Sequence, residues 1–379
     1  MKKLIYLDNA ATSPVCEAAK AATNEAMELF ANPSSAHAAG TDARRRVEEA
    51  RKMIASAAGA PSDGVIFTSG GTEADALALL GGVSRRGRTV IISDSEHPAV
   101  EMNAKELERR GWKVFCIPTR GGRLDLDALR AEAEKGDTAL MSVMHVNNET
   151  GAIYDVAEAA RIVRTYNPDC FIHSDCVQSF CRERFTLLSL GVDAVSVSAH
   201  KIGGVKGAGA LICRAGLHLK PVVFGGGQEK GLRSGTENTV GIAAFAAAVS
   251  WALPNLDAER ERVFSLREQM KALLAPHGVI FNEPERFSPH VLSVSIPGLK
   301  SEVALRMLSD RGVMLSAGSA CSSKLGVSPV LKAFGLPRAV ADGTLRISFG
   351  ALNTPEEIGA AAAGIAAVAA LASPRGSAS

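Results

Sequence analysis

The sequence lacks a large net charge, a disulfide pattern and a close cluster of metal ligands. It has 42 Lys and Arg residues against 40 Asp and Glu residues, a formal net charge of +2, and the basic residues are spread along the chain. A balance so near zero leaves no electrostatic footprint for a nucleic acid or an anionic membrane. Local sites, and not the overall charge, must therefore recognise any ligand.

Cysteine is present, but in a pattern that excludes a disulfide framework. The seven cysteines are scattered through a long chain, and no Cys-x-x-Cys pair occurs. The nearest group, Cys170, Cys176 and Cys181, lacks the close ligand pairs of a zinc site. We therefore expect no metal, and we interpret these thiols as small buried hydrophobes. Only Cys321 has a sequence context that suggests reactivity.

Targeting and membrane segments are also lacking. Asp8 and Asn9 interrupt the apolar run at the N-terminus before a signal-peptide core is complete. The Ala-rich stretch 359–372 is expected to be too short and too weakly apolar to span a bilayer. These features favour a cytoplasmic, reducing location.

The apolar fraction, 46% of residues, is ample for a large buried core and excludes overall disorder. Between residues 65 and 213, short apolar runs alternate with amphipathic stretches. This alternation predicts an α/β fold with a mostly parallel, seven-stranded sheet covered on both faces. The predicted strands are 65–67, 89–93, 113–117, 138–144, 171–174, 194–198 and 208–213, with crossover helices at 98–110, 125–135 and 155–166.

The remainder of the chain has the pattern of a smaller α+β unit. Helical patterns at 237–253 and 257–274 are separated by a break at Pro254. We therefore expect a large domain over residues 16–255 and a small domain formed by 256–379 together with 1–15. In the small domain, strands are predicted at 291–296 and 344–349 and helices at 301–309 and 354–371.

The segment 65–73 places a strand, a turn of small residues and a helix start in one line. Free N–H groups at a helix N-terminus, approached through Gly70 and Gly71, make a phosphate cradle. An ordinary turn capped by Thr72 is the alternative. No G-x-x-x-x-G-K-[ST] pattern is present, so a nucleoside triphosphate is not indicated.

Two further strand ends carry reactive groups toward the same sheet edge, where ligands of parallel sheets gather. Lys201, which follows the strand 194–198, has the amine needed for a Schiff base with a carbonyl cofactor, although a solvated loop lysine is the alternative. Asp175 follows the strand 171–174. Its carboxylate suits the ring nitrogen of pyridoxal phosphate, with a plain helix cap as the alternative.

Several motifs, in this order, resemble those of the cysteine desulfurases of the nitrogen-fixation and iron–sulfur-cluster type. They are Ser-Glu-His-Pro-Ala-Val (95–100), His-Val-Asn-Asn-Glu-Thr-Gly (145–151), Ser-Ala-His-Lys (198–201), Arg-Ser-Gly-Thr-Glu-Asn (233–238) and Gly-Ser-Ala-Cys (318–321). The resemblance runs from Tyr6 to Gly350. It implies the class V aminotransferase fold, which is fold type I of the pyridoxal-phosphate enzymes, and conversion of L-cysteine to L-alanine.

The resemblance also assigns contacts to pyridoxal 5′-phosphate. It implies that Lys201 binds the cofactor covalently, that Asp175 pairs with the ring nitrogen and that Gln178 contacts the ring hydroxyl. His97 would stack on the ring as an acid/base, with Asn148 beside it. The phosphate would be held by Gly71, Thr72, Ser198 and His200, and by Thr236 of the neighbouring subunit of a homodimer.

For the substrate, the resemblance implies that Arg346 binds the carboxylate, assisted by Asn32 and Asn148; an ordinary strand arginine is the alternative. Cys321 lies in a run of small and polar residues, 316–326, which we expect to form a mobile, exposed loop. Its thiolate would take the sulfur as a persulfide. An acceptor protein, such as an iron–sulfur scaffold, would then receive that sulfur.

Other functions of the same fold are a selenocysteine lyase, an aminotransferase and a non-catalytic scaffold. Cys321 favours the desulfurase, because amino transfer and elimination from selenocysteine do not strictly require a protein thiol. Two positions depart from the family pattern: Cys176 stands where Ala is commoner, and Phe224 where a polar residue is commoner. Relatives that supply iron–sulfur scaffolds often have a longer C-terminal tail, which leaves the acceptor open.

Overall fold

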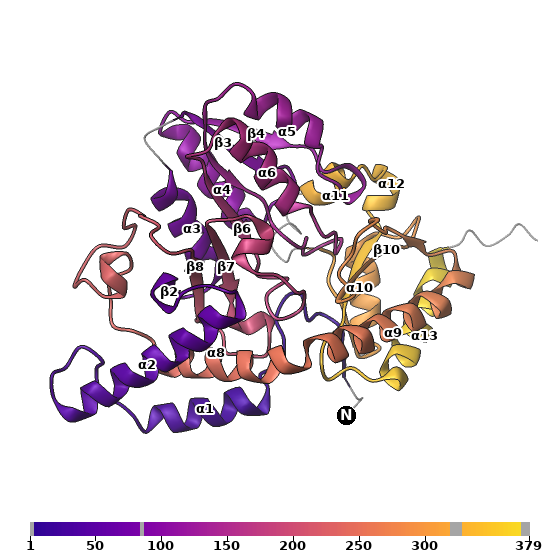
Figure 1. The fold of residues 1–379 in the computed structure, drawn as a ribbon. Coiled ribbons are helices and arrows are strands. Elements are labelled where there is room, and N and C mark those ends of the chain that lie inside the picture. The colour runs from indigo at the N-terminus through magenta and orange to yellow at the C-terminus, as the bar shows by residue number, and fades with distance from the viewer. Residues whose placement is uncertain (1–3, 84–86, 319–327, 373–379) are drawn as a thin grey trace, which may run out of the picture.

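A seven-stranded sheet is the centre of the larger part of the computed structural model, which describes residues 4–83, 87–318 and 328–372 (Figure 1). The strand order is β2–β8–β7–β6–β5–β3–β4, and all neighbours are parallel except the pairs that β8 makes with β2 and β7. The mostly parallel α/β sheet is therefore confirmed. The strands are β2 (Val65–Thr68), β3 (Thr89–Ser93), β4 (Lys113–Ile117), β5 (Thr138–Ser142), β6 (Phe171–Asp175), β7 (Ala194–Ser198) and β8 (Gly209–Cys213).

Alternate residues of these strands supply two separate cores, because successive side chains of a strand point to opposite faces. On β5, Leu140 packs with helices α3 (Gly71–Gly82) and α4 (Pro98–Arg109). Its neighbour Met141 belongs to the core on the opposite face. That second core also takes residues from α2 (Ala38–Ala57), α5 (Leu126–Ala133), α6 (Val156–Tyr166) and α8 (Thr239–Ala252).

Helices α1 (Glu17–Met27) and α2 were absent from the sequence prediction. Both pack against α8 below the sheet in Figure 1. Only Ala19 and Ala26 of α1 are buried, so this helix lacks the broad apolar stripe that marks an amphipathic helix in a sequence. Between α6 and β7 lies a further short helix, α7 (Leu187–Leu190).

The smaller part of the chain contains an antiparallel sheet of three strands in the order β12–β10–β9. Next to it, β1 (Ile5–Tyr6) pairs in parallel with β11 (Val313–Met314), so that the N-terminus joins this part of the fold. Ile5 and Leu7 share its core, whereas the exact domain boundary at 255 stays a prediction. The remaining elements are β9 (Ile280–Phe281), β10 (Val291–Ser295), β12 (Thr344–Ser348), α9 (Leu256–Leu274), α10 (Ser301–Ser309), α11 (Pro329–Phe334), α12 (Arg338–Ala341) and α13 (Pro355–Ala372).

The expected break at Pro254 is a single turn of 3-10 helix, Leu253–Asn255, between α8 and α9. Figure 1 shows the two helices as one nearly continuous line from the larger sheet to the smaller one. By length and composition, the stretch 239–277 and α13 are each long and apolar enough to cross a membrane. This differs from the expectation for 359–372, because α13 begins earlier, at Pro355, and reaches 18 residues.

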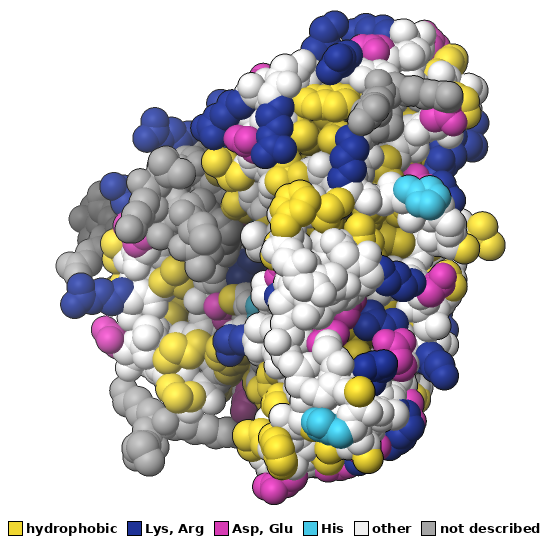
Figure 2. All heavy atoms as spheres, turned by 90° about the vertical axis from the view of Figure 1, so that its left-hand side faces the viewer, with side chains coloured by type: hydrophobic (Ala, Val, Ile, Leu, Met, Phe, Trp, Pro, Cys, Tyr) yellow, Lys and Arg dark blue, Asp and Glu magenta, His cyan; other side chains and the backbone are white. Residues whose placement is uncertain are grey.

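Neither stretch needs a lipid environment to explain its composition. Phe245 and Val249 of α8 lie in the core beneath the large sheet, and Ile358 and Ile365 of α13 lie in the core of the smaller part. Core helices of globular proteins are apolar for this same reason. On the face shown in Figure 2, Lys and Arg side chains lie among Asp and Glu, in keeping with the near-zero net charge.

Replacing Leu140 by Ala is expected to destabilise the fold by about 2–5 kcal/mol, because Leu140 is fully buried on the central strand β5 and the truncation leaves a cavity. Urea unfolding followed by circular dichroism measures the change in the free energy of unfolding. Leu188→Ala is the control, since Leu188 is 89% exposed. Equal stability of the two variants would contradict the described packing.

Candidate active site

A cavity of about 250 Å³ lies at the carboxyl ends of β6 and β7. This is the edge at which parallel sheets bind ligands, and the structure gathers most of the predicted site residues there. They reach it from α3, from the start of α4, from the loops after β5, β6 and β7, and from β12. The residues lining it include Gly71, Thr72, His97, Asn148, Asp175, Gln178, Ser198, His200, Lys201 and Arg346.

One end of this cavity is the N-terminus of α3. The N-cap residue is Gly70, with a φ of 157°, and no side chain caps the helix, so Thr72 does not have the capping role considered as an alternative. A Cβ atom on Gly71 would lie 2.6 Å from Cγ2 of Val177, so only glycine fits there. The free N–H groups of the first turn, next to Ser198 and His200, form a site suited to a phosphate.

Asp175 and His97 both line the cavity, and each affects the protonation of the other through its charge. Oδ1 of Asp175 accepts a hydrogen bond from the Val177 N–H at 2.8 Å, which closes a turn and does not cap a helix. Burial raises the pKa of Asp175, and the nearby His97 opposes this rise. Nδ1 of His97 accepts from the Ala99 N–H at 3.1 Å, and burial lowers the pKa of this imidazole. The neutral ring therefore carries its proton on Nε2.

Lys201 is not a solvated loop lysine, which was the alternative interpretation of this residue. Its Nζ donates to the carbonyl oxygens of Ala10 at 2.6 Å and Ala11 at 2.8 Å. Burial, followed by the positive charges of Arg346 and Arg182, lowers its pKa to about 7. A substantial fraction of the amine is therefore uncharged at neutral pH, as a nucleophilic amine requires.

Gln178 and His200 are held close to Lys201 by the N-terminal segment. Nε2 of Gln178 donates to the Ala10 carbonyl at 2.9 Å, the same oxygen that accepts from Lys201. Nδ1 of His200 lies 3.2 Å from Oγ1 of Thr12, and burial lowers the pKa of this imidazole to about 4. At neutral pH His200 is therefore uncharged and can offer a hydrogen bond, but not a full charge, to a ligand.

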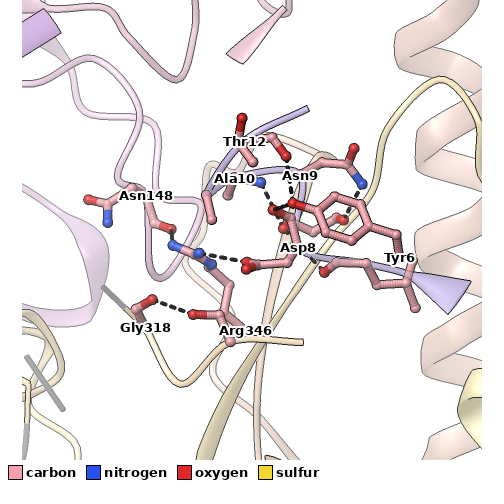
Figure 3. Close-up of polar contacts among 12 residues, drawn as sticks. Tyr6, Asp8, Asn9, Ala10, Thr12, Asn148, Gly318 and Arg346 are labelled. Carbon is pink, nitrogen blue, oxygen red and sulfur yellow. Dashed lines mark hydrogen bonds and ion pairs between the residues drawn. The ribbon is translucent and has the colours of Figure 1, made fainter. Parts of the chain in front are cut away.

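Arg346 lies on β12 and extends between two other segments (Figure 3). One terminal nitrogen donates to the Asn148 carbonyl at 2.8 Å, and the other forms an ion pair with Oδ1 of Asp8 at 2.9 Å. The side chain is only 3% exposed, and its Nε is buried without a hydrogen-bond partner among the described residues. This environment distinguishes Arg346 from an ordinary arginine on the surface of a strand.

Two described residues that the sequence assigns to the site, Asn32 and Thr236, do not line the cavity. Asn32 is exposed, and its Oδ1 accepts from the Ser34 N–H at 2.8 Å within its own turn. Thr236 is exposed and does not line the cavity either. Cys321 lies outside the described residues. The sequence-based roles of these residues stay predictions.

Sequence analysis missed three acidic residues at or near the cavity. Asp8 pairs with Arg346, Asp75 lines the cavity and Glu96 is buried close by. Burial raises the pKa of Asp75 well above its usual range, and its Oδ1 has no hydrogen-bond partner among the described residues. A signal was available for Asp75, because it lies four residues after Gly71 and so shares one face of α3.

Neither of the two departures from the family pattern lines the cavity. Cys176 is completely buried, does not line the cavity and has its pKa raised to about 12 by burial, which supports the packing interpretation. Phe224 is 79% exposed. Within the part of the chain that the structure describes, no group of three or more His, Cys, Asp or Glu side chains is placed to hold a metal ion.

Comparisons of sequence and of structure with known proteins identify relatives of the same kind. The sequence profile of aminotransferase class-V proteins matches residues 5–360. The chain is 39% identical over 367 residues to the cysteine desulfurase IscS of Dictyoglomus turgidum, covering 94% of this chain and 92% of that protein. It is 34% identical to the cysteine desulfurase NifS of Azotobacter vinelandii, covering 93% and 90%. A solved NifS-like protein superposes with a TM-score of 0.91 at 34% identity, covering 98% of this chain and all of that one.

Replacing Glu96 by Gln is expected to remove a pH-dependent loss of stability. Burial raises the pKa of Glu96 in the folded protein to about 8, whereas its ordinary value is 4.5. Between these values the folded state holds a proton that the unfolded state has lost. The stability of the wild type relative to the Gln variant is therefore highest below about pH 4.5 and falls as the pH rises toward 8.

Urea unfolding across this pH range measures the effect as a difference in slope between the two proteins. Glu108→Gln is the control, since Glu108 is exposed on α4. If the Glu96 variant keeps the wild-type slope, Glu96 is ionised in the folded state and the assignment is wrong.

Proposed function

Because the chain belongs to the class-V aminotransferase family and is a cysteine desulfurase, we propose that its cavity binds pyridoxal 5′-phosphate and L-cysteine and that Cys321 receives the sulfur. The main support is that one cavity brings together three residues that are separated in the sequence. They are Lys201, whose amine is only partly protonated at neutral pH, and the buried side chains of Asp175 and Arg346. These are the groups that a carbonyl cofactor, its ring nitrogen and an amino-acid carboxylate each require.

The donor set of the cavity fits the cofactor. The uncapped N-terminus of α3, with Ser198 and His200, would hold the phosphate. Asp175 would pair with the ring nitrogen, Gln178 would contact the ring hydroxyl, and the amine of Lys201 would form the covalent link. When bound, pyridoxal phosphate supplies an electron sink for bonds broken at the substrate carbon atoms.

Arg346 would bind and orient the substrate carboxylate. Its guanidinium is held by Asn148 and Asp8, while its buried Nε–H has no partner among the described residues. A donor that is buried and unsatisfied is favourably placed for an incoming carboxylate oxygen, since leaving it unpaired costs about 1–3 kcal/mol. The resemblance adds Asn148 and Asn32 as assisting groups, and Asn148 lines the same cavity.

Lys201 and His97 would move protons around the substrate. A substantial fraction of the Lys201 amine is an uncharged base at neutral pH, because burial and the nearby arginines lower its pKa to about 7. His97 has an imidazole whose pKa is lowered by burial, so it is neutral at the same pH and can take a proton from a thiol. Both side chains line the cavity, within reach of one bound substrate.

Cys321 would act as the nucleophile toward sulfur. Its thiolate attacks the sulfur of the bound cysteine, so an S–S bond forms while the C–S bond of the substrate breaks. The carbon atom gains a proton and leaves as the methyl group of L-alanine, and the enzyme keeps a Cys321 persulfide. No external oxidant or reductant is needed for this half of the reaction, because one thiol and one cysteine yield one persulfide and one alanine.

We also propose a homodimer in which each subunit completes the site of the other. Thr236 is exposed and lies outside the cavity of its own chain, and Thr72 at the phosphate end of the cavity is exposed as well. A hydroxyl from a partner subunit would complete the phosphate contacts there. The sulfur then passes to an acceptor protein in the cytoplasm, for which an iron–sulfur scaffold is one candidate.

Lys201→Ala tests the cofactor assignment. The purified wild-type protein loaded with pyridoxal phosphate is expected to be yellow, because a pyridoxal ring linked to a lysine absorbs visible light. The variant is expected to lose this absorbance, together with more than about 99% of alanine formation. Lys206→Ala, which removes an exposed lysine of the same loop, is the matched control and should keep both. A yellow Lys201→Ala protein would overturn the assignment.

Cys321→Ala tests the sulfur transfer. After incubation with L-cysteine, mass spectrometry of the wild-type protein is expected to find one added sulfur atom on the peptide that contains Cys321. The variant should still bind cysteine but form almost no alanine, because no thiol is left to accept the sulfur. Cys116→Ala, which removes an exposed cysteine, is the control. Normal turnover in Cys321→Ala would favour the lyase alternative.

A further inference from the structure

Arg182 is a buried cation for which the reaction as described has no role. It follows β6 in the loop that contains Gln178, and the whole residue is only 6% exposed. One terminal nitrogen donates to Oε1 of Gln178 at 3.3 Å. The other donates to Oγ of Ser13 at 3.0 Å, to the Asn9 carbonyl at 3.4 Å and to the Lys201 carbonyl, which is the closest of these contacts.

All of these acceptors are neutral. Within the described ranges of the chain, no carboxylate lies within 4.0 Å of the Arg182 guanidinium, and Glu183 pairs instead with Arg260. Burial lowers the pKa of Arg182 to about 10, which still leaves it charged at neutral pH. A buried charge without an ion pair is unfavourable for folding, so the charged Arg182 side chain lowers the stability of the folded state.

The position of Arg182 relative to Lys201 suggests what this charge does. Arg182 binds the carbonyl of Asn9, while the amine of Lys201 binds the carbonyls of Ala10 and Ala11. The side chains of Arg182 and Lys201 thus bind three consecutive carbonyl groups of one segment. Arg182 also binds the main chain of Lys201 itself, so the two residues cannot move independently.

Charges on several elements surround Lys201 and Arg182. Near Lys201, Arg346 adds to the effect of Arg182, whereas Asp175 and Asp8 oppose it. Near Arg182, the carboxylates of Glu259 and Glu183 and the thiol of Cys181 favour its charged form, and Arg346 disfavours it. The two acidic groups favour the protonated amine of Lys201, whereas burial, which is the largest cause, and the charges of Arg346 and Arg182 favour the neutral amine.

We propose that Arg182 is a positioning residue for Lys201 and Gln178: its guanidinium fixes the Lys201 main chain and the Gln178 amide, and its buried charge favours the unprotonated Lys201 amine. This inference rests on the proposed function, in which that amine reacts with the cofactor. Gln178 is held from both ends, because its Nε2 donates to Ala10 while its Oε1 accepts from Arg182. Arg182 does not line the cavity, whereas Lys201 and Gln178 do, so Arg182 acts through these two residues.

The test measures the amine of Lys201 directly, without activity. The full-length protein is freed of cofactor with hydroxylamine, dialysed and labelled with acetic anhydride over a series of pH values, and the Lys201 peptide is quantified by mass spectrometry. Arg182→Gln is expected to move the midpoint of Lys201 labelling upward by about half a pH unit, which slows labelling about twofold at pH 7. Arg182→Lys keeps a positive charge and is expected to retain the wild-type profile.

Lys52, which is exposed on α2, serves as the internal reference in every digest and should label identically in all proteins. An unchanged Lys201 profile in Arg182→Gln would overturn the proposal, and so would an equal shift in both variants, because geometry without charge would then explain it. If Arg182→Gln does not fold, Arg182→Met is measured in its place with the same expectation. A failure of the proposed function would appear separately, as a Lys201→Ala protein that still becomes yellow with the cofactor.

Discussion

The reactive amine of Lys201 is held by neutral hydrogen-bond acceptors, and the arrangement of the cavity depends on the neutrality of these acceptors. Lys201 donates to the carbonyls of Ala10 and Ala11, and no acidic side chain substitutes for them in the described hydrogen bonds. A carboxylate at this distance would stabilise the ammonium form and remove the nucleophile. Main-chain carbonyls satisfy the N–H groups without adding a full negative charge, so burial is free to lower the pKa of the amine.

Arg346, in the same cavity, instead has a negatively charged partner. Its guanidinium pairs with Asp8, only two residues before the carbonyl that accepts from Lys201. An arginine stays charged in any protein environment, so a carboxylate partner positions it without altering its protonation. One short segment therefore supplies a carboxylate to Arg346 and carbonyl oxygens to Lys201. The carboxylate suits an arginine that binds another carboxylate, and the carbonyl oxygens suit an amine that must react.

Much of the sheet could be predicted from the sequence, because its strands are short apolar runs whose burial needs no knowledge of distant partners. The bounds of β3, β4 and β7 agree with the predicted ranges, and β5 is shorter by two residues, of which Met144 lines the cavity and Val143 packs in the core. Site residues carried by motifs, such as Lys201 and Asp175, were also identified. The contacts of Arg182 with Asn9 and of Arg346 with Asp8 could not be predicted, because each joins residues more than 170 positions apart.

The pairing of β1 with β11, together with the contacts of Asp8 and Asn9 on β12, has a consequence for synthesis on the ribosome. Residues 8–10 contribute to the cavity together with Arg346, which lies 338 positions after Asp8 and is therefore synthesised much later. The segment with the carbonyls of Asn9, Ala10 and Ala11 is bound to the large part of the fold through Arg182 and Lys201 and to the small part through Ser348 and Arg346. The complete set of contacts around the reactive lysine therefore forms only after β12 has been synthesised.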